Sequence, residues 1–204
     1  MRSRWVDASV VVLVTTIVVL GAITPGYSQA RDTVSRMASP GQAFALLAAL
    51  GFVSYGVLVL LGTRSFQSLL VARLTGVYGV TAVIAGLAPK DPSDGTHTLA
   101  SQIHVDATII GGIAIITAMT IVGVRSPRLA ARRGSLPCAV LTCATAFAFR
   151  YAWGSPVYGL VERAMLALAM GWLAWIARAD ARQSFASLTN PDQIETHSFQ
   201  TAGG

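Results

Sequence analysis

The sequence predicts an all-α membrane protein built as one bundle of six transmembrane helices. Of its 204 residues, 53% are hydrophobic and only 12% are charged, whereas soluble domains carry about 25% charged residues. Six long apolar runs follow one another along the chain, and each approaches the roughly 20 residues that a helix needs to cross a bilayer. The runs are continuous and do not alternate with polar residues, which favours helices over the strands of a barrel.

Prolines, glycines and polar segments set the boundaries of the expected helices. The helices are expected at residues 8–24, 43–61, 69–88, 99–124, 134–151 and 157–177. The fifth run has the shortest apolar stretch and needs its flanks to reach across the membrane. Residues 1–178 therefore form a single domain. The polar segment 179–204 is expected to continue briefly as a helix and then to form a disordered tail.

The first apolar run has two interpretations. A signal peptide would combine the basic residues Arg2 and Arg4 with an apolar stretch and a small-x-small site at residues 28–30. The apolar stretch is longer than that of a typical signal peptide, and Asp7 lies at its entry. These two features favour a helix that stays attached.

The basic residues predict the orientation of the bundle. The net charge is +6, but the basic residues lie in short segments between apolar runs and are not interleaved with stacking aromatics, so nucleic-acid binding is not predicted. One side holds Arg2, Arg4, Arg64, Arg73, Arg125, Arg128, Arg132, Arg133, Arg178 and Arg182, and the other holds Arg31, Arg36, Lys90 and Arg150. Because cytoplasmic loops are enriched in Lys and Arg, both termini are expected in the cytoplasm. The lipid bilayer is the one partner that the sequence predicts.

Ionisable residues inside the expected helices mark a candidate site, because charged side chains are costly in lipid and commonly serve binding or proton transfer. The candidate polar cluster consists of Asp91, Asp94, His97, His104, Glu162 and Arg163. All lie toward the outer side of the predicted topology. We expect His104 and Arg163 to reach one shared carboxylate, which the loop supplies from Asp91 or Asp94. Asp106 is a further candidate partner for Arg163.

Three other interpretations of the polar residues stay open. Imidazole and carboxylate groups are suitable ligands for a divalent metal such as zinc, and the candidate ligands are His97, His104 and Asp91. No HExxH motif is present. A serine nucleophile is suggested by Ser35, with His104 as its base and Asp91 as a third catalytic candidate, although no nucleophile elbow surrounds this serine. Alternatively, the cluster is a hydrogen-bond network that only ties helices together.

Three stretches of the chain resemble one family of membrane proteins. They are Pro25-Gly26-Tyr27 with Arg31-Asp32-Thr33-Val34-Ser35, then Gly86-Leu87-Ala88-Pro89-Lys90-Asp91 with Ile103-His104, and Gly159-Leu160-Val161-Glu162-Arg163 with Trp172. The resemblance is to the DUF998 family of bacterial and archaeal multi-pass membrane proteins, and it spans most of residues 8–178. It implies a six-helix fold in a bacterial plasma membrane and draws attention to Ser35, Asp91, His104 and Arg163. It implies no substrate.

Three functions therefore remain in view. The leading hypothesis is a membrane protein whose outward-facing polar cluster binds a proton, an ion or a small polar ligand. The second is a membrane-embedded, metal-dependent lipid hydrolase, so the sequence leaves open whether the protein is an enzyme. The third is a structural or assembly protein.

Overall fold

The structure is a computed structural model that describes residues 3–91 and 98–189, with side chains described as far as Arg182. Every regular element in these residues is helical. The elements are α1 (Arg4–Thr15), the π-helical η1 (Thr16–Leu20), α2 (Gly21–Ile23), the 3₁₀ helices η2 (Val34–Ala38) and η3 (Thr63–Ser65), α3 (Ala45–Gly62), α4 (Leu69–Leu87), α5 (Leu99–Arg125), α6 (Leu129–Tyr151) and α7 (Tyr158–Thr189). The all-α prediction is confirmed.

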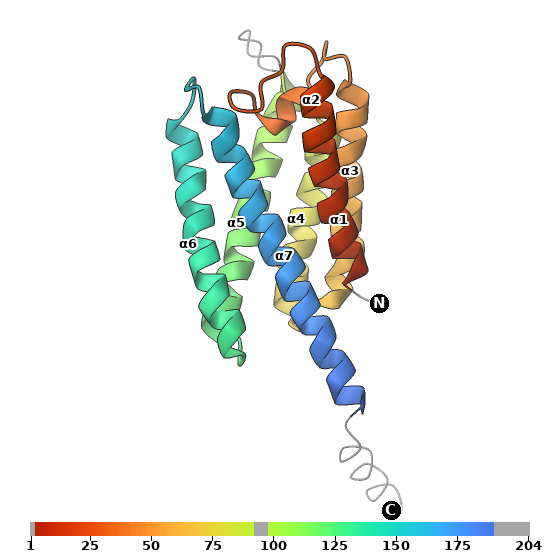
Figure 1. Cartoon of the computed structure of the whole chain (residues 1–204), viewed down its shortest axis with the longest axis vertical. Coiled ribbons are helices and arrows are strands. Elements are labelled where there is room, and N and C mark those ends of the chain that lie inside the picture. The colour runs from red at the N-terminus through yellow and green to blue at the C-terminus, as the bar shows by residue number, and fades with distance from the viewer. Residues whose placement is uncertain (1–2, 92–97, 190–204) are drawn as a thin grey trace, which may run out of the picture.

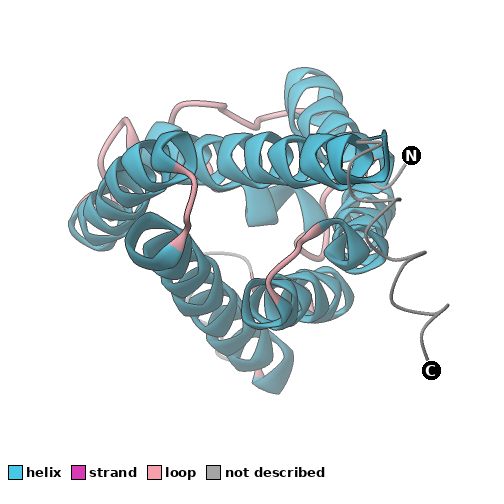
Figure 2. Ribbon diagram, turned by 90° about the horizontal axis from the view of Figure 1, so that it is seen from below, coloured by secondary structure: helices cyan, strands magenta, loops and turns pink. Residues whose placement is uncertain are grey.

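The long helices lie side by side in one bundle (Figures 1 and 2). The start of α1 and the end of α7 lie at the same end of this bundle (Figure 1), so the chain runs along it an even number of times. We call this end the basic end. We call the opposite end the loop end, because the segment 24–44, which joins α2 to α3, folds over it (Figure 1).

Among the residues that the structure describes, five helical segments are long and apolar enough to cross a membrane. They are Arg4–Ile23, Ala45–Ser65, Leu69–Leu87, Leu99–Arg125 and Tyr158–Arg182. The remaining long helix, α6, has 23 residues but carries arginines near both of its ends, which lowers its mean hydropathy. Since it runs alongside the other helices in the bundle (Figure 1), it completes an even number of passes. A multi-pass membrane protein is therefore supported, and α6 remains the least apolar pass.

Large apolar side chains cover much of the outside of the bundle, as a lipid solvent requires. Leu46 is 73% exposed and Ile113 is 62% exposed, although both lie in helices that are predominantly apolar. Inside the bundle, Trp172 is buried and its indole Nε1–H donates to Ser135 Oγ at 2.8 Å. The indole of Trp172 thus finds its hydrogen-bond partner within the protein.

Two ion pairs join α7 to other elements at the basic end. Arg128 pairs with Asp180, whose side chain is only 8% exposed, and the backbone N–H of Gln67 donates to the same carboxylate at 3.0 Å. Arg178 pairs with Asp7 of α1 at 2.8 Å, and these side chains are 57% and 33% exposed. The first pair is buried and the second lies in the open.

The helix boundaries differ from the predicted ones at the starts of α1 and α6. α1 begins at Arg4 and not at residue 8. α6 begins at Leu129 and not at 134, with Pro137 inside the helix. α7 continues to Thr189, so residues 179–189 form the helical extension that was expected beyond the apolar segment. No glycine or proline interrupts this stretch, and Asp180 is fixed to Arg128. Residues 190–204 lie outside the described residues. The π-helical segment η1 was not predicted, because it has no signature in apolar periodicity.

The distribution of arginines gives a testable orientation. The basic end collects the larger of the two groups of basic residues, so we expect this end to face the cytoplasm. Reporter fusions after Arg64, Arg128 and Arg182 should report the cytoplasm, and a fusion after Asp94 should report the opposite side. Fusions after Arg128 and Asp94 that report the same side would contradict the six-helix topology.

Candidate functional site

The segment 24–44 is a folded loop held together by Asp32. This carboxylate accepts a hydrogen bond from the backbone N–H of Ser28 at 2.7 Å and forms an ion pair with Arg36. The loop continues as η2, where Met37 is completely buried. An aspartate that accepts from backbone N–H groups stabilises a turn in the way that other short polar side chains do. The loop is therefore an ordered cover over the end of the bundle.

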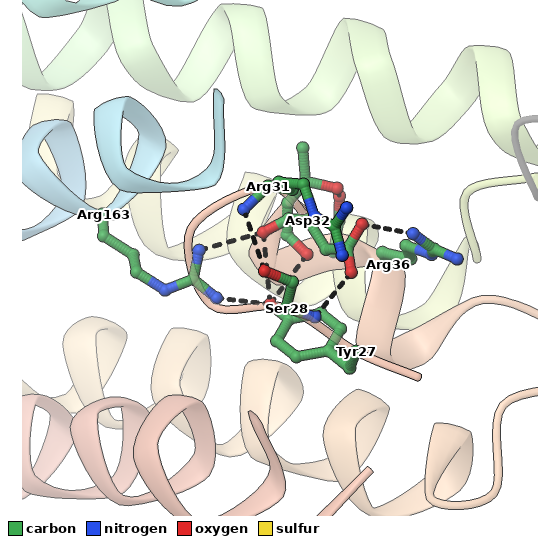
Figure 3. A network of polar contacts seen from close by, with 8 residues as sticks. Tyr27, Ser28, Arg31, Asp32, Arg36 and Arg163 are labelled. Carbon is green, nitrogen blue, oxygen red and sulfur yellow. Dashed lines mark hydrogen bonds and ion pairs between the residues drawn. The ribbon is translucent and has the colours of Figure 1, made fainter. Parts of the chain in front are cut away.

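Arg163 of α7 fixes this loop to the last helix (Figure 3). Its Nε donates to Gln29 Oε1 at 2.8 Å, and its Nη1 donates to the backbone oxygen of Asp32 at 2.9 Å. Nη1 also donates to the oxygen of Gly159 at 2.8 Å, and Nη2 donates to the hydroxyl of Tyr27. All four acceptors are uncharged. The guanidinium thus keeps its positive charge while its donors are satisfied.

Gly159 allows the close approach of the loop to α7. A Cβ atom at this position would lie 2.3 Å from the backbone oxygen of Asp32, which is too short for any contact. The backbone N–H of Leu160, in the first turn of α7, donates to the oxygen of Ala30 at 3.1 Å. A free N–H group at the start of the helix is thereby satisfied by the loop.

Tyr27 completes the contact between the loop and α7. Its hydroxyl donates to the backbone oxygen of Thr33 at 3.0 Å and accepts from Arg163. Burial raises the pKa of Tyr27 to about 12, although the positive charge of Arg163 acts in the opposite direction. The hydroxyl therefore stays protonated at neutral pH and keeps its donor role.

Glu162 and Lys90 lie beside this contact and carry opposite charges. Glu162 accepts a hydrogen bond from the backbone N–H of Val34. The Lys90 ammonium lies 5.4 Å from the ring centre of Trp153, which stacks edge-on against Tyr158. Burial lowers the pKa of Lys90, and the charge of Glu162 raises it. Within the described residues the two groups attract each other without forming an ion pair.

Within the described residues, which do not include the predicted partner Asp94, His104 shares no carboxylate with Arg163. Its Nδ1 lies 2.9 Å from the backbone oxygens of both Ala85 and Ala88 at the end of α4. Because both neighbours are acceptors, Nδ1 carries the proton. His104 thus satisfies carbonyl groups that the end of a helix leaves free.

Asp91 caps the connection that leads into α5. Its carboxylate accepts from the backbone N–H of Thr98 at 2.6 Å and from the Thr98 hydroxyl at 2.8 Å. The Thr98 hydroxyl in turn caps α5 by accepting from the N–H of Ser101. The expected pairing of Arg163 with Asp91 is therefore not observed, and Asp106 is instead hydrogen-bonded to Gln102. Asp94 and His97 lie outside the described residues.

The catalytic and metal candidates are not brought together in the described part of the chain. Ser35 lies in η2, where its hydroxyl donates to Thr33 Oγ1 at 3.3 Å, and His104 faces the carbonyl groups of α4. No group of three or more metal-ligating side chains occurs among the described residues. The zinc hypothesis included His97, so it remains a sequence-based hypothesis.

Comparison with known proteins identifies the family. The model of the family described as "Protein of unknown function (DUF998)" matches residues 8–179. The chain belongs to the DUF998 family. The match begins within α1, ends within α7 and includes the folded loop. No curated protein and no solved structure matches the chain.

Several contact residues of this DUF998 protein were not singled out as site residues from the sequence. Tyr27, Gln29 and Asp32 lie in a loop, where polar residues are ordinary. The sequence feature that could have indicated an ordered loop is the pair of Pro-Gly turns at 25–26 and 40–41, one at each end of it. Both glycines have positive φ values, 70° and 86°, a conformation that favours glycine.

Proposed function

We propose that this family member is a plasma-membrane protein that binds a small polar ligand or a proton at the loop end, through Glu162 and Lys90. The observation that carries the proposal is the relation between these two groups. They attract each other, yet the described residues give them no ion pair with each other or with another side chain. A carboxylate and an amine held in this way are available to a third, polar component.

The surroundings favour a small ligand that carries both charges. A cationic group of the ligand is attracted to the carboxylate of Glu162. An anionic group is attracted to Lys90. A compound with an amino group and a carboxyl group, such as a free amino acid, complements this arrangement. A proton bound by Glu162 is the simplest alternative occupant.

Arg163 has a different role in this proposal. Its four hydrogen bonds end on groups of the protein itself, so it supports the site by holding the loop in place. The same observation favours a purely structural protein as the second candidate function. The hydrolase hypothesis gains no support, because Ser35 and His104 have separate hydrogen-bond partners.

Variants of the two charged residues test the binding proposal. We expect at least one amino acid to stabilise the detergent-purified parent against thermal unfolding, by about 2.7 kcal/mol at a hundredfold excess over its Kd. Glu162→Gln and Lys90→Gln should each abolish this stabilisation. Arg150→Gln, which removes an exposed charge near the same end, is the matched control and should retain it.

Infrared spectroscopy tests the proton alternative. If Glu162 binds a proton, lowering the pH should produce a carboxylic acid C=O band that is missing in Glu162→Gln. If no amino acid stabilises the parent and the infrared titration of Glu162→Gln equals that of the parent, the binding proposal is wrong. The structural function is then the better conclusion.

A further inference from the structure

A groove between α1 and α7 lies at the basic end, far from the loop that Arg163 fixes. It has a volume of about 400 Å³ and is lined by Val10 of α1 and by residues of α7 that include Met170, Gly171, Trp175, Arg178 and Arg182. Positions 171, 175, 178 and 182 recur at helical spacing, so they lie along one face of α7. The groove is therefore apolar along most of its length and basic where α7 leaves the apolar segment.

The charges of the groove are not balanced. Arg178 is paired with Asp7 at 2.8 Å. Arg182 is exposed and forms no ion pair within the described residues. One carboxylate thus faces two guanidinium groups, which leaves one positive charge. This charge lies at the polar end of the apolar segment Tyr158–Arg182, which is long enough to cross a membrane.

Gly171 and Trp175 shape the apolar part. A Cβ atom at Gly171 would have no neighbouring atom within 4 Å, so the missing side chain leaves open space. Trp175 lies against α6, where a Cβ atom at Gly134 would be 2.3 Å from its ring. The indole therefore forms one side of the groove. Tryptophan is commonly found at the lipid–water boundary.

We propose that this groove binds one anionic phospholipid. Its phosphate lies between Arg182 and Arg178, and one acyl chain lies over Gly171 and Met170 against Val10. The charge surplus explains a preference for an anionic headgroup, because basic residues at the membrane surface attract anionic lipids. The apolar floor explains why the occupant is a lipid and not a free anion. The site is independent of the proposed ligand site at the loop end.

Native mass spectrometry of the delipidated full-length protein tests this proposal. The probes are phosphatidylglycerol and phosphatidylcholine with identical acyl chains. We expect one phosphatidylglycerol to be retained in preference to phosphatidylcholine. Arg182→Gln should reduce this preference about fivefold, as expected for the loss of one basic residue at a lipid surface. Arg73→Gln, which removes an exposed arginine of α4, is the control and should leave it unchanged.

A second variant separates the groove from general charge attraction. Gly171→Leu fills the open space without meeting protein atoms and should reduce the retention of both lipids. Gly112→Leu, at another glycine with open space, should leave retention unchanged. Equal retention of both lipids by the parent, or a Gly171→Leu variant that binds like the parent, would overturn the proposal. Inorganic phosphate that displaces phosphatidylglycerol would also overturn it, because the site would then be a simple anion site.

Discussion

Replacing Arg128 with methionine should destabilise the protein in detergent by about 3–5 kcal/mol, the range seen when one partner of a buried ion pair is removed. The side chain of Asp180 is only 8% exposed, so its negative charge would lose its ion-pair partner in a place that water hardly reaches. The measurement is the free energy of unfolding from a denaturant titration. Methionine keeps most of the length and apolar volume of the arginine side chain.

The second ion pair at the same end is the control for this prediction. Arg178 and Asp7 are much more exposed, so Arg178→Met should cost at most about 1 kcal/mol. The double variant Arg128→Met/Asp180→Asn should be more stable than Arg128→Met alone, because it also removes the buried negative charge of residue 180 and keeps an acceptor for Gln67. If Arg128→Met and Arg178→Met cost the same, burial does not determine the strength of these pairs.

Replacing Arg163 with methionine should release the loop from α7. Four hydrogen bonds from a charged donor are lost, and the oxygens of Asp32 and Gly159 lose a donor, so we expect a loss of about 3 kcal/mol of stability. The loop carries Arg31, which is exposed, and Arg36, whose side chain is 43% exposed. Tryptic cleavage at these residues should accelerate at least about tenfold, because proteolysis follows the population of the open form.

A neighbouring arginine provides the control for the loop prediction. Arg150 is exposed, lies toward the same end of the bundle, and has no hydrogen bond or ion pair among the described residues. Arg150→Met should therefore leave both the stability and the cleavage rate of the loop unchanged. A parent-like cleavage rate in Arg163→Met would mean that Asp32 and the buried Met37 hold the loop without help from α7.

The membrane helices were predictable because a continuous apolar run long enough to cross a bilayer has few alternative structures. The predictions are weakest where the helices extend beyond their apolar segments. α7 continues past its apolar part, as the predicted helical extension, but the pairing of Asp180 with the distant Arg128 could not be seen in the sequence. The start of α6 was missed because Arg132 and Arg133 interrupt the apolar run without interrupting the helix.

The hydrogen-bond partners of the candidate residues could not be predicted from the sequence. The cost of charge in lipid singled out Glu162, Arg163 and His104, and it implied that each needs a partner. For Arg163 and His104 the expected partners were side-chain carboxylates. The observed partners of Arg163 and His104 include backbone carbonyl groups. Because every residue has a carbonyl group, these partners cannot be predicted from the types of residue in the sequence. Val34 donates its backbone N–H to Glu162 in the same way.

The contacts between the first loop and the last helix also impose an order on biogenesis. Tyr27 and Arg163 are separated by 136 positions in the chain, and Val34 and Glu162 by 128. At a synthesis rate of about 5–20 residues per second, the loop emerges roughly ten seconds before its partners exist. During that interval the five helical segments before α7 can enter the membrane, while the loop still lacks its contacts with α7. Insertion of α7 is therefore the step that closes the bundle, and a chain truncated before residue 159 leaves the ribosome with the loop end open.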